Sequence, residues 1–555
     1  MRQYGIGYSK IELICDYLIV SIILSLMFAL VEYICSSRVD YIVYVGTLVG
    51  LTVVTILFRK QKLYRLERTP TLFFMIVGTF YFIILSLYLY SFPYFPLHFS
   101  IDFVTHLQDA LDIMGGKYTS TLFPANFAIK FLLSAWLSIG FDNILLFARL
   151  FVMFLSWSTI FPVYSLGYRI GGEKIGEIAL ISYVLISPFW YYVFIETGLY
   201  ANMLGVIIGL YFIRRFIIML ERNSFVDYIL VVLSSFVMFL AHSSNMLVVG
   251  ASILGFVYLN LFENKKVQFK IVLVPLIGLL LVLAFFPYLI FRLPSALQGP
   301  YTEIAFTDRV FEFFKSNSLT FLSYIYAYNR ISLVLFVLIV IEFIRLFLKR
   351  NLGYYSILFI WFFGAFGLSF FSSNVWRFAL LSFIPMSILL AKVFYDIILP
   401  IYSRIEAFMT SPNMKRLLKY QLIVLVIIVL LFFSSVDPIP ALRFASWSRY
   451  QQDRIYEVMI WLRDNSEENA TIVSVSNSQF FFLPIVAYRE FNGILFDAYP
   501  ENAYSYLKER RPGYVIVWNR LHRYNESWYY VDLYRESEYF VEVWSNSEFS
   551  IFKVK

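Results

Sequence analysis

Two carboxylates and a histidine stand at helical spacing in the first long polar stretch of a very apolar chain. Asp102, His106 and Asp109 occupy positions i, i+4 and i+7, so a helix would place all three on one face. The opposite side is apolar, with Ile101, Val104, Leu107, Leu111 and Met114. The pattern predicts a short amphipathic helix at a membrane surface that ends at Gly115-Gly116. A carboxylate there faces lipid-borne and water-borne reactants; a solvated helix without chemistry is the alternative.

Other polar residues stand near the ends of apolar runs, on the side of the membrane that we predict for Asp102. They are Lys130, Arg149, Glu196, Tyr200, Asn202, His242, Asn245, Arg292 and Arg377. A charge at the centre of a membrane helix costs on the order of 2.5–3.5 kcal/mol, so we expect these groups at helix ends or facing a wet cavity. Ordinary snorkelling explains any single Lys or Arg equally well. It explains Glu196 and His242 less well, because these side chains cannot snorkel far.

One reaction would use all of these groups, namely transfer of a sugar from a lipid phosphate to an acceptor outside the cell. The acceptor hydroxyl must lose its proton as it attacks the anomeric carbon, and a carboxylate is a suitable base. The charge of the leaving lipid phosphate grows in the transition state, and Arg or Lys at the membrane surface can stabilise it. The lipid tail would need a groove between helices, for which the many Phe and Leu residues are suited.

The composition defines the class of protein. Of 555 residues, 60% are hydrophobic and 20% aromatic, and the mean hydropathy is +0.72. Soluble domains are about 45–50% apolar, so we interpret the chain as a polytopic membrane protein. The net charge of +8 does not indicate nucleic acid, because the basic residues collect in short loops between apolar runs. Cys15 and Cys35 stand at opposite ends of one predicted span, which excludes a disulfide between them and leaves no cysteine-based metal site.

Basic loops all fall on one side of the membrane if the chain has about thirteen spans. The spans whose two bounds we predict are at about 12–35, 39–58, 71–92, 143–167, 175–194, 197–213, 271–291 and 420–435. The basic segment 59–68 places the N-terminus in the cytoplasm, and the first apolar run is expected to remain as a helix. The short segment 124–140 is expected to lie at the outer surface, because a further span there would reverse every later loop.

The composition changes after Val436, where charged residues become frequent. An amphipathic helix is predicted at 448–465 and a second helix at about 501–511. Strands are predicted at Thr471–Val475, Gly493–Phe496, Tyr514–Trp518 and Phe540–Trp544. Alternating strands and helices predict a small extracytoplasmic α/β domain. We therefore divide the chain into two N-terminal helices with a basic loop (1–70), a membrane module (71–436) with a first outer loop (92–142), and the outer domain (437–555).

Short motifs make the sequence resemble the GT-C superfamily of polytopic glycosyltransferases, which includes protein O-mannosyltransferases, the lipid A aminoarabinose transferase and the oligosaccharyltransferase catalytic subunit. The motifs are Asp102-Phe103-Val104-Thr105-His106, Phe147-Ala148-Arg149-Leu150, Ser187-Pro188 through Tyr200-Ala201-Asn202, and Trp376-Arg377-Phe378. Trp461-Leu462-Arg463-Asp464-Asn465 is similar to the start of the family's outer domain. The order of the motifs is more specific than any one of them.

The resemblance implies a mainly α GT-C fold, a sugar donor on polyprenyl (dolichyl) phosphate, and an extracytoplasmic protein or glycan as acceptor. On this interpretation Asp102 would be the base, His106 would orient it or contact the donor phosphate, and Glu196 would bind the acceptor or the sugar. The donor phosphate would be held by Arg377, Arg149, Arg292 and Lys130. Acceptor or sugar contacts would come from Tyr200, Asn202, His242 and Asn245.

Two differences from the family's motifs narrow the predicted type of transferase. An oligosaccharyltransferase would carry WWDYG where this chain reads Val473-Ser474-Val475-Ser476-Asn477-Ser478-Gln479. It would also carry an acidic metal-binding pair near Gly198, where this chain has Ala201 and Asn202, and Glu196 as the nearest acid. We therefore expect a single-sugar, inverting transferase without a tightly bound metal ion. A divalent cation at Asp102 stays open.

Two other functions fit a many-spanning chain. A flippase or transporter for a lipid-linked glycan would need ionisable groups within the spans and internal repeat symmetry, and the sequence shows neither clearly. A glycan polymerase or ligase would usually lack a separate C-terminal α/β domain. The transferase remains the leading hypothesis because the charges collect on one predicted face.

Overall fold

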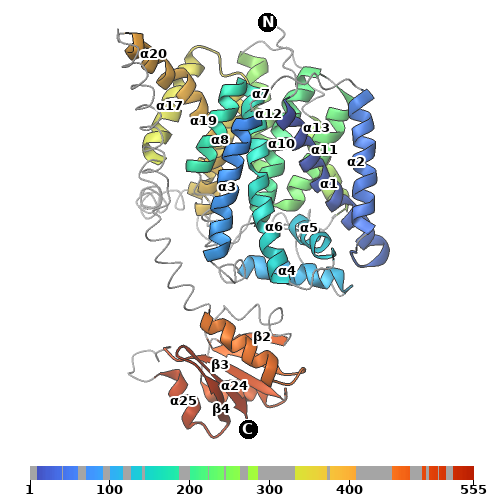
Figure 1. The fold of residues 1–555 in the computed structure, drawn as a ribbon, viewed down its shortest axis with the longest axis vertical. Coiled ribbons are helices and arrows are strands. Elements are labelled where there is room, and N and C mark those ends of the chain that lie inside the picture. Colours follow the sequence, from blue (N-terminus) through green and yellow to red (C-terminus); the bar gives the residue numbers. More distant parts are fainter. Residues whose placement is uncertain are drawn as a thin grey trace, which may run out of the picture. The chain divides into compact units, whose positions relative to one another are not determined.

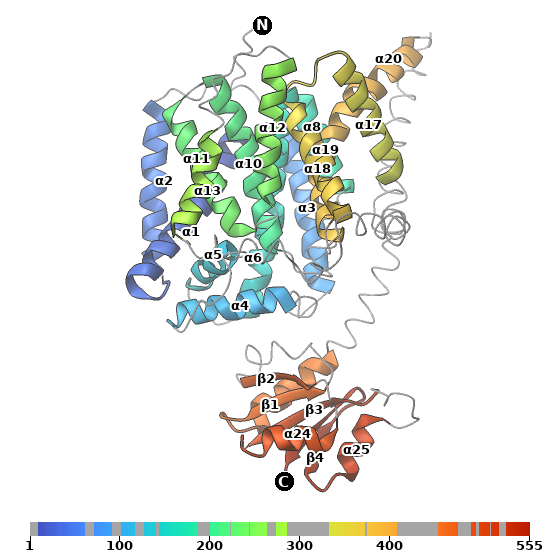
Figure 2. The ribbon, with the colours of Figure 1, turned by 180° about the vertical axis from the view of Figure 1, so that it is seen from behind.

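A computed structural model of the chain contains two compact units, which we describe separately (Figures 1 and 2). The first unit covers Met1–Leu87, Asp109–Phe194 and Leu199–Asp437, and the second covers Tyr88–Gln108, Ile195–Gly198 and Pro438–Lys555. The residues whose structure is described are 9–40, 42–60, 71–91, 101–116, 127–139, 144–186, 200–222, 224–242, 245–262, 273–285, 332–371, 375–407, 453–475, 490–495, 499–510, 512–520 and 529–555.

Helices make up the described part of the first unit, because an α-helix satisfies all its backbone polar groups internally when it crosses lipid. The helices before Gly172 are α1 (Lys10–Ser36), α2 (Ile42–Lys60), α3 (Thr71–Ser91), α4 (Ile101–Met114), α5 (Phe127–Leu137), α6 (Ile144–Ser158) and α7 (Ile160–Gly171). Those after it are α8 (Glu173–Ile186), α10 (Tyr200–Arg222), α11 (Phe225–Ala241), α12 (Met246–Phe262), α13 (Val274–Phe285), α17 (Ser332–Leu348), α18 (Tyr355–Phe371), α19 (Val375–Val393) and α20 (Leu399–Ala407). α4 begins in the second unit and ends in the first.

Four helices among the described residues are long and apolar enough to cross a membrane. They are Lys10–Ser36, Leu146–Gly171, Tyr200–Arg222 and Ile384–Arg404. Several further apolar helices are shorter, such as α11 with 17 residues. The count of about thirteen spans therefore stays a prediction, and the span predicted at about 420–435 lies outside the described residues.

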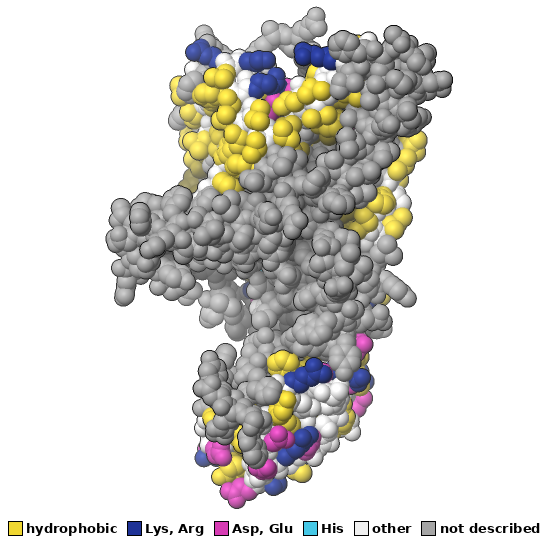
Figure 3. All heavy atoms as spheres, turned by 90° about the vertical axis from the view of Figure 1, so that its left-hand side faces the viewer, with side chains coloured by type: hydrophobic (Ala, Val, Ile, Leu, Met, Phe, Trp, Pro, Cys, Tyr) yellow, Lys and Arg dark blue, Asp and Glu magenta, His cyan; other side chains and the backbone are white. Residues whose placement is uncertain are grey.

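The flank of the first unit is apolar where a bilayer would contact it. Exposed large hydrophobic side chains on α2 are Ile42, Val45, Leu48, Val49, Val53 and Ile56, and those on α3 are Leu72, Met75, Ile76, Phe80, Phe82 and Ile83. Figure 3 shows hydrophobic side chains over this unit, with Lys and Arg side chains gathered toward one end of it. So large an exposed apolar surface is unfavourable in water. Together with the long apolar helices it identifies a multi-pass membrane protein.

α19 continues into α20 through a π turn, η4 (Phe394–Ile398). The N–H of Leu399 donates to the carbonyl five residues back, which is the π pattern. We attribute the wider turn to Pro400, which has no N–H and whose ring would collide with the carbonyl of Asp396 in a regular α-helix. The π turn carries Asp396, whose carboxylate accepts a hydrogen bond from Arg345 of α17.

The second unit contains a mixed five-stranded sheet with strand order β2-β1-β3-β5-β4. Its strands are β1 (Thr471–Val475), β2 (Glu490–Leu495), β3 (Gly513–Trp518), β4 (Phe540–Ser545) and β5 (Phe549–Val554). β1 pairs in parallel with β2 and β3, whereas β5 pairs antiparallel with β3 and β4. Helices at 453–465, α24 (Pro500–Leu507) and α25 (Tyr530–Glu536) accompany the sheet. The predicted α/β character of this region is confirmed.

The sequence missed strand β5, and the physical reason is its central place in the sheet. β5 lies between β3 and β4, and five of its six residues are buried, so it lacks the alternation of an edge strand. The turn before β5 contains an asparagine, a residue typical of turns, which could have indicated the hairpin. Asn546 Oδ1 accepts from the backbone N–H groups of Glu548 and Phe549, at 2.9 and 2.8 Å, which closes the β4–β5 hairpin.

Candidate functional site

The polar stretch around Asp102 forms α4, and the helix ends at the glycine pair as predicted. Gly116 has φ of 68°, the left-handed conformation common at helix C-termini. Among the α4 side chains that the structure describes, the buried ones are Phe103, His106, Leu107, Ala110 and Ile113. His106 is thus 5% exposed and belongs to the buried side of α4, whereas the spacing predicted it on an open polar face. Asp102 lies in the first turn, and its side chain is outside the described residues.

Lys130 of α5 forms an ion pair with Asp109, in the part of α4 that belongs to the first unit. The two side chains are 6% and 16% exposed. A buried ammonium group requires such a partner, because removing an unpaired charge from water costs several kcal/mol. The sequence indicated Asp109 and Lys130 separately, and the structure brings them together.

α5 has 11 residues and is about 16 Å long at 1.5 Å per residue, which is too short to cross a bilayer. This agrees with the prediction that 124–140 does not span. The helix does not lie open at a surface, however, because nine of its residues are buried. Phe131 packs edge-on against Tyr33 of α1 with ring centroids 5.2 Å apart, and Trp136 stacks on Phe154 of α6 at 5.7 Å.

The N-terminal ends of α10 and α12 meet through a glycine. Asn202 lies in the first turn of α10, and Gly205 follows one turn later. The amide of Asn245, just before α12, occupies the place that a Cβ atom of Gly205 would take. Its Nδ2 donates to the carbonyl of His242 at 3.1 Å. The Oδ1 atoms of Asn202 and Asn245 are buried and accept no hydrogen bond in the described part of the chain.

The remaining predicted residues are placed less completely. Tyr200 begins α10 and is fully buried, and Arg149 lies half-buried on α6. Arg377 lies in the first turn of α19, and its side chain is outside the described residues. Glu196 and Arg292 also lie outside them. The roles of all these residues therefore stay predictions.

The sequence did not decide whether a divalent cation binds at Asp102. Among the described side chains, no group of three or more His, Cys, Asp or Glu could hold a metal ion. The side chain of Asp102 is not in that set, so its use of a cation stays a prediction.

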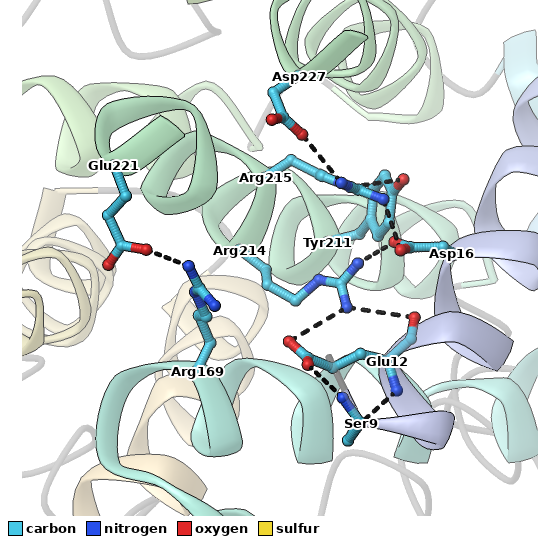
Figure 4. Close-up of polar contacts among 9 residues, drawn as sticks. All are labelled: Ser9, Glu12, Asp16, Arg169, Tyr211, Arg214, Arg215, Glu221 and Asp227. Atoms are coloured by element: carbon cyan, nitrogen blue, oxygen red, sulfur yellow. Dashed lines mark hydrogen bonds and ion pairs between the residues drawn. The ribbon is translucent and has the colours of Figure 1, made fainter. Parts of the chain in front are cut away.

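A buried ion network that the sequence did not predict joins α1, α10 and α11 (Figure 4). Its charged members are Glu12 and Asp16 of α1, Arg214 and Arg215 of α10, and Asp227 of α11, each with a fully buried side chain. Asp16 pairs with both arginines, and its oxygen lies 2.6 Å from Arg215. Arg215 also lies 3.0 Å from Asp227 and donates to the Tyr211 hydroxyl at 3.1 Å. Arg214 is 3.7 Å from Glu12.

The sequence contained a signal for this network. The span predicted at about 197–213 would place Arg214 and Arg215 beyond its end. That expectation is wrong, because α10 continues to Arg222 and buries both arginines. The apolar residues 216–220 after the arginines argue for a continuing helix, and the four-residue spacing of Glu12 and Asp16 puts two acids on one face of α1.

Comparison with known proteins finds similarity in structure alone. No protein-family model matches the sequence, and no curated protein matches it. The crystal structure of ArnT from Cupriavidus metallidurans bound to undecaprenyl phosphate aligns with a TM-score of 0.52 at 11% identity, over 85% of this chain and 97% of that chain. The apo crystal structure of the Archaeoglobus fulgidus oligosaccharyltransferase aligns with a TM-score of 0.49 at 12% identity, over 80% of this chain and 69% of that one.

The likeness to ArnT shows the fold of this chain. It covers nearly the whole of the ArnT chain. The chain therefore has the GT-C fold, as the sequence resemblance predicted.

Proposed function

We propose that this protein is a membrane glycosyltransferase that moves one sugar from a polyprenyl (dolichyl) phosphate to an extracytoplasmic protein or glycan. The observation that carries the proposal is the GT-C fold, which aligns with 97% of an ArnT chain crystallised with undecaprenyl phosphate. The apolar flank of the helical unit is suited to a donor that arrives from the lipid phase. The basic end of that unit would face the cytoplasm, with the α4–α5 end outside.

In the proposed reaction an acceptor hydroxyl attacks the anomeric carbon of the donor sugar. Asp102 takes the hydroxyl proton as the new oxygen–carbon bond forms. The bond between the anomeric carbon and the phosphate oxygen breaks, and its electron pair leaves with the lipid phosphate. Attack from the opposite side inverts the anomeric configuration. Basic side chains stabilise the phosphate as its charge grows, and Lys130 and Arg149 are the candidates whose positions are described.

The ends of α10 and α12 support a sugar or acceptor subsite. The Oδ1 atoms of Asn202 and Asn245 are buried acceptors, and an unsatisfied buried acceptor costs about 1–3 kcal/mol. Hydroxyl groups of a sugar would supply the donors. His106 would orient Asp102 or contact the donor phosphate, and Glu196 would bind the acceptor.

A transporter of lipid-linked glycans is the second candidate, and the buried ion network is the observation that favours it. Buried ionisable groups within membrane helices are typical of ion-coupled carriers. In this chain Asp16 and both arginines bind one another in a closed set of ion pairs that joins three helices. The transferase accounts for the fold as well, so we place it first.

Replacement of the proposed base tests the function directly. Membranes that contain wild type or Asp102→Asn are supplied with labelled polyprenyl-phosphate sugars, and label transferred to protein, glycolipid or water is measured. Asp112→Asn is the matched control, because it removes a carboxylate from the same helix. We expect a loss of at least about 100-fold for Asp102→Asn, the lower range for general base catalysis, and near-normal transfer for Asp112→Asn.

Each outcome has a separate meaning. Equal losses in both variants would remove Asp102 as the base and leave the transferase in place. Absence of transfer by wild type with every donor, combined with movement of the donor across sealed vesicles, would support the transporter instead.

A further inference from the structure

α1 carries fixed charges at one end and contacts the predicted donor site region at the other. Glu12 and Asp16 are in its first two turns and are fully buried against Arg214 and Arg215. Seventeen residues after Asp16, about 26 Å along the helix, Tyr33 packs on Phe131 of α5. The residue before Phe131 in α5 is Lys130, which pairs with Asp109.

Apolar packing alone does little to fix the position of such a helix along its axis. Lipid tails are as apolar as the side chains of α1, so no hydrophobic force sets its register against its neighbours. Buried polar groups do set register, because one turn of sliding leaves charges without partners. In this network Asp16 bridges two arginines, and Arg215 bridges α1 to Asp227 of α11. Rotation or sliding of α1 would break its contacts with both arginines of α10 at once.

Polar contacts of α5 include the Lys130–Asp109 ion pair with α4 and a hydrogen bond from the Tyr44 hydroxyl of α2 to the carbonyl of Ala135. With 11 residues α5 cannot span the bilayer, and its place depends on the helices around it. Its described contacts with α1 and α6 are aromatic, such as Phe131 on Tyr33 and Trp136 on Phe154. A shift of α1 along its axis would therefore move the surface on which Phe131 and the adjoining Lys130 rest.

We propose that the network of Glu12, Asp16, Arg214, Arg215 and Asp227 is a register lock for α1 that positions α5 and thereby Lys130. Glu12 and Asp16 are on this view positioning residues, acting at a distance on a group that binds the donor phosphate. The register lock stands without the proposed function, whereas its effect on donor binding rests on that function.

Cross-linking measures the register of α1 directly and needs no substrate. Cysteines replace Tyr33 and Phe131 in a background in which the exposed Cys35 is changed to serine. A short thiol-specific cross-linker is used, because a disulfide requires Cα atoms about 4.4–6.8 Å apart. The rate of cross-linking in membranes is compared between the parent and Asp16→Asn. We expect Asp16→Asn to slow it about fivefold or more, the lower range of coupling between distant sites.

Glu221→Gln is the matched control. It removes the carboxylate of another ion pair of a buried arginine, Arg169–Glu221, whose side chains are 4% and 34% exposed. That pair joins α7 to α10 and does not include α1. We expect it to leave the cross-linking rate within about twofold of the parent, below the range of coupling between sites. Equal slowing by Asp16→Asn and Glu221→Gln would overturn the register lock, because it would show general loosening. If Asp16→Asn does not accumulate, Glu12→Gln serves in its place, because its 3.7 Å contact is the weakest in the network.

Transfer kinetics then test the link to Lys130. Asp16→Asn and Lys130→Met should each raise KM for the polyprenyl-phosphate donor, and the double variant should lose less than the product of the two effects. Fully multiplicative effects would separate the network from Lys130 and overturn the positioning role. If wild type transfers no sugar, the proposed function fails, and the cross-linking result still decides the register lock.

Discussion

Ion pairs in the two units of this protein have different surroundings. In the helical unit, Asp16 and its arginine partners are fully buried. In the second unit, Lys553 and Glu467 pair with side chains 35% and 43% exposed. Exposed pairs contribute about 0–1 kcal/mol, whereas removal of one partner from a buried pair costs about 3–5 kcal/mol. The surroundings, and not the residue types, decide which of these pairs the fold depends on.

The largest effect is expected for Arg214→Met, which leaves Asp16 and Glu12 without one of their cations. We expect a loss of about 3–5 kcal/mol in the free energy of unfolding, because two carboxylates remain in a buried site. Thermal unfolding in detergent measures the change. Arg222→Met, at the end of the same helix, is the control and should cost less than about 1 kcal/mol. Equal losses would show that the buried network has no special weight.

A purely steric change on α10 sharpens the comparison, because it tests whether charge alone makes this helix sensitive. Gly205→Ala places a methyl group where the Asn245 amide lies, and we expect a loss of about 1–3 kcal/mol from overpacking. Gly250→Ala on α12 is the control, because nothing lies within 4 Å of its added Cβ. It should be neutral or stabilise by up to about 1 kcal/mol through helix propensity. Thermal unfolding of both variants decides, and an unchanged Gly205→Ala would contradict the packing.

The exposed pair predicts a small effect that depends on pH. Lys553, and then the Tyr514 hydroxyl, bind Glu467 and lower its pKa to about 2 from an ordinary value of 4.5. Because the folded-state pKa is the lower one, this stabilisation is complete above about pH 4.5 and is lost as the pH falls toward 2. Glu467→Gln should remove this pH dependence and cost less than about 1 kcal/mol at pH 7. Hydrogen exchange of β3 and β5, corrected for intrinsic rates, reports it.

The smallest effect is expected for the pair Arg535–Glu542, in which the guanidinium is 45% exposed. At about 1 M salt the screening length falls to about 3 Å, so the pair should lose most of its few tenths of a kcal/mol. The same salt concentration should not change what the buried ion network contributes to the free energy of unfolding of the helical unit. A large salt effect on that unit would contradict the burial of Asp16 and Arg214.

The local sequence pattern predicted an element correctly where the residues that determine it lie within one segment. The polar spacing and the glycine pair predicted α4 and its end, and the run Thr471–Val475 was predicted with the bounds that β1 has. It failed where neighbours decide. β5 is buried by strands on both sides, and His106 faces inward although its spacing from Asp102 predicted an open face.

The candidate site divides in the same way. Sequence selected Lys130, Asn202 and Asn245 as polar residues near the ends of apolar runs, and all three are buried in the structure. It could not show that Lys130 pairs with Asp109 or that the Asn245 amide rests on Gly205, because these contacts join separate helices. The Asp102→Asn variant tests the predicted role of Asp102, and the roles of Glu196, Arg292 and Arg377 stay predictions.

The sequence by itself determined that this is a many-spanning membrane protein with a C-terminal α/β region, because lipid requires long apolar helices and the change in composition after Val436 is visible in one dimension. Its motif order also indicated the GT-C fold. Only the tertiary structure decided that Arg214 and Arg215 lie inside α10 and bind acids of α1 and α11. In the sequence, a charge near the end of an apolar run indicates the boundary of a loop. Only the structure shows that the partner of this charge, about 200 residues away in the chain, lies beside it.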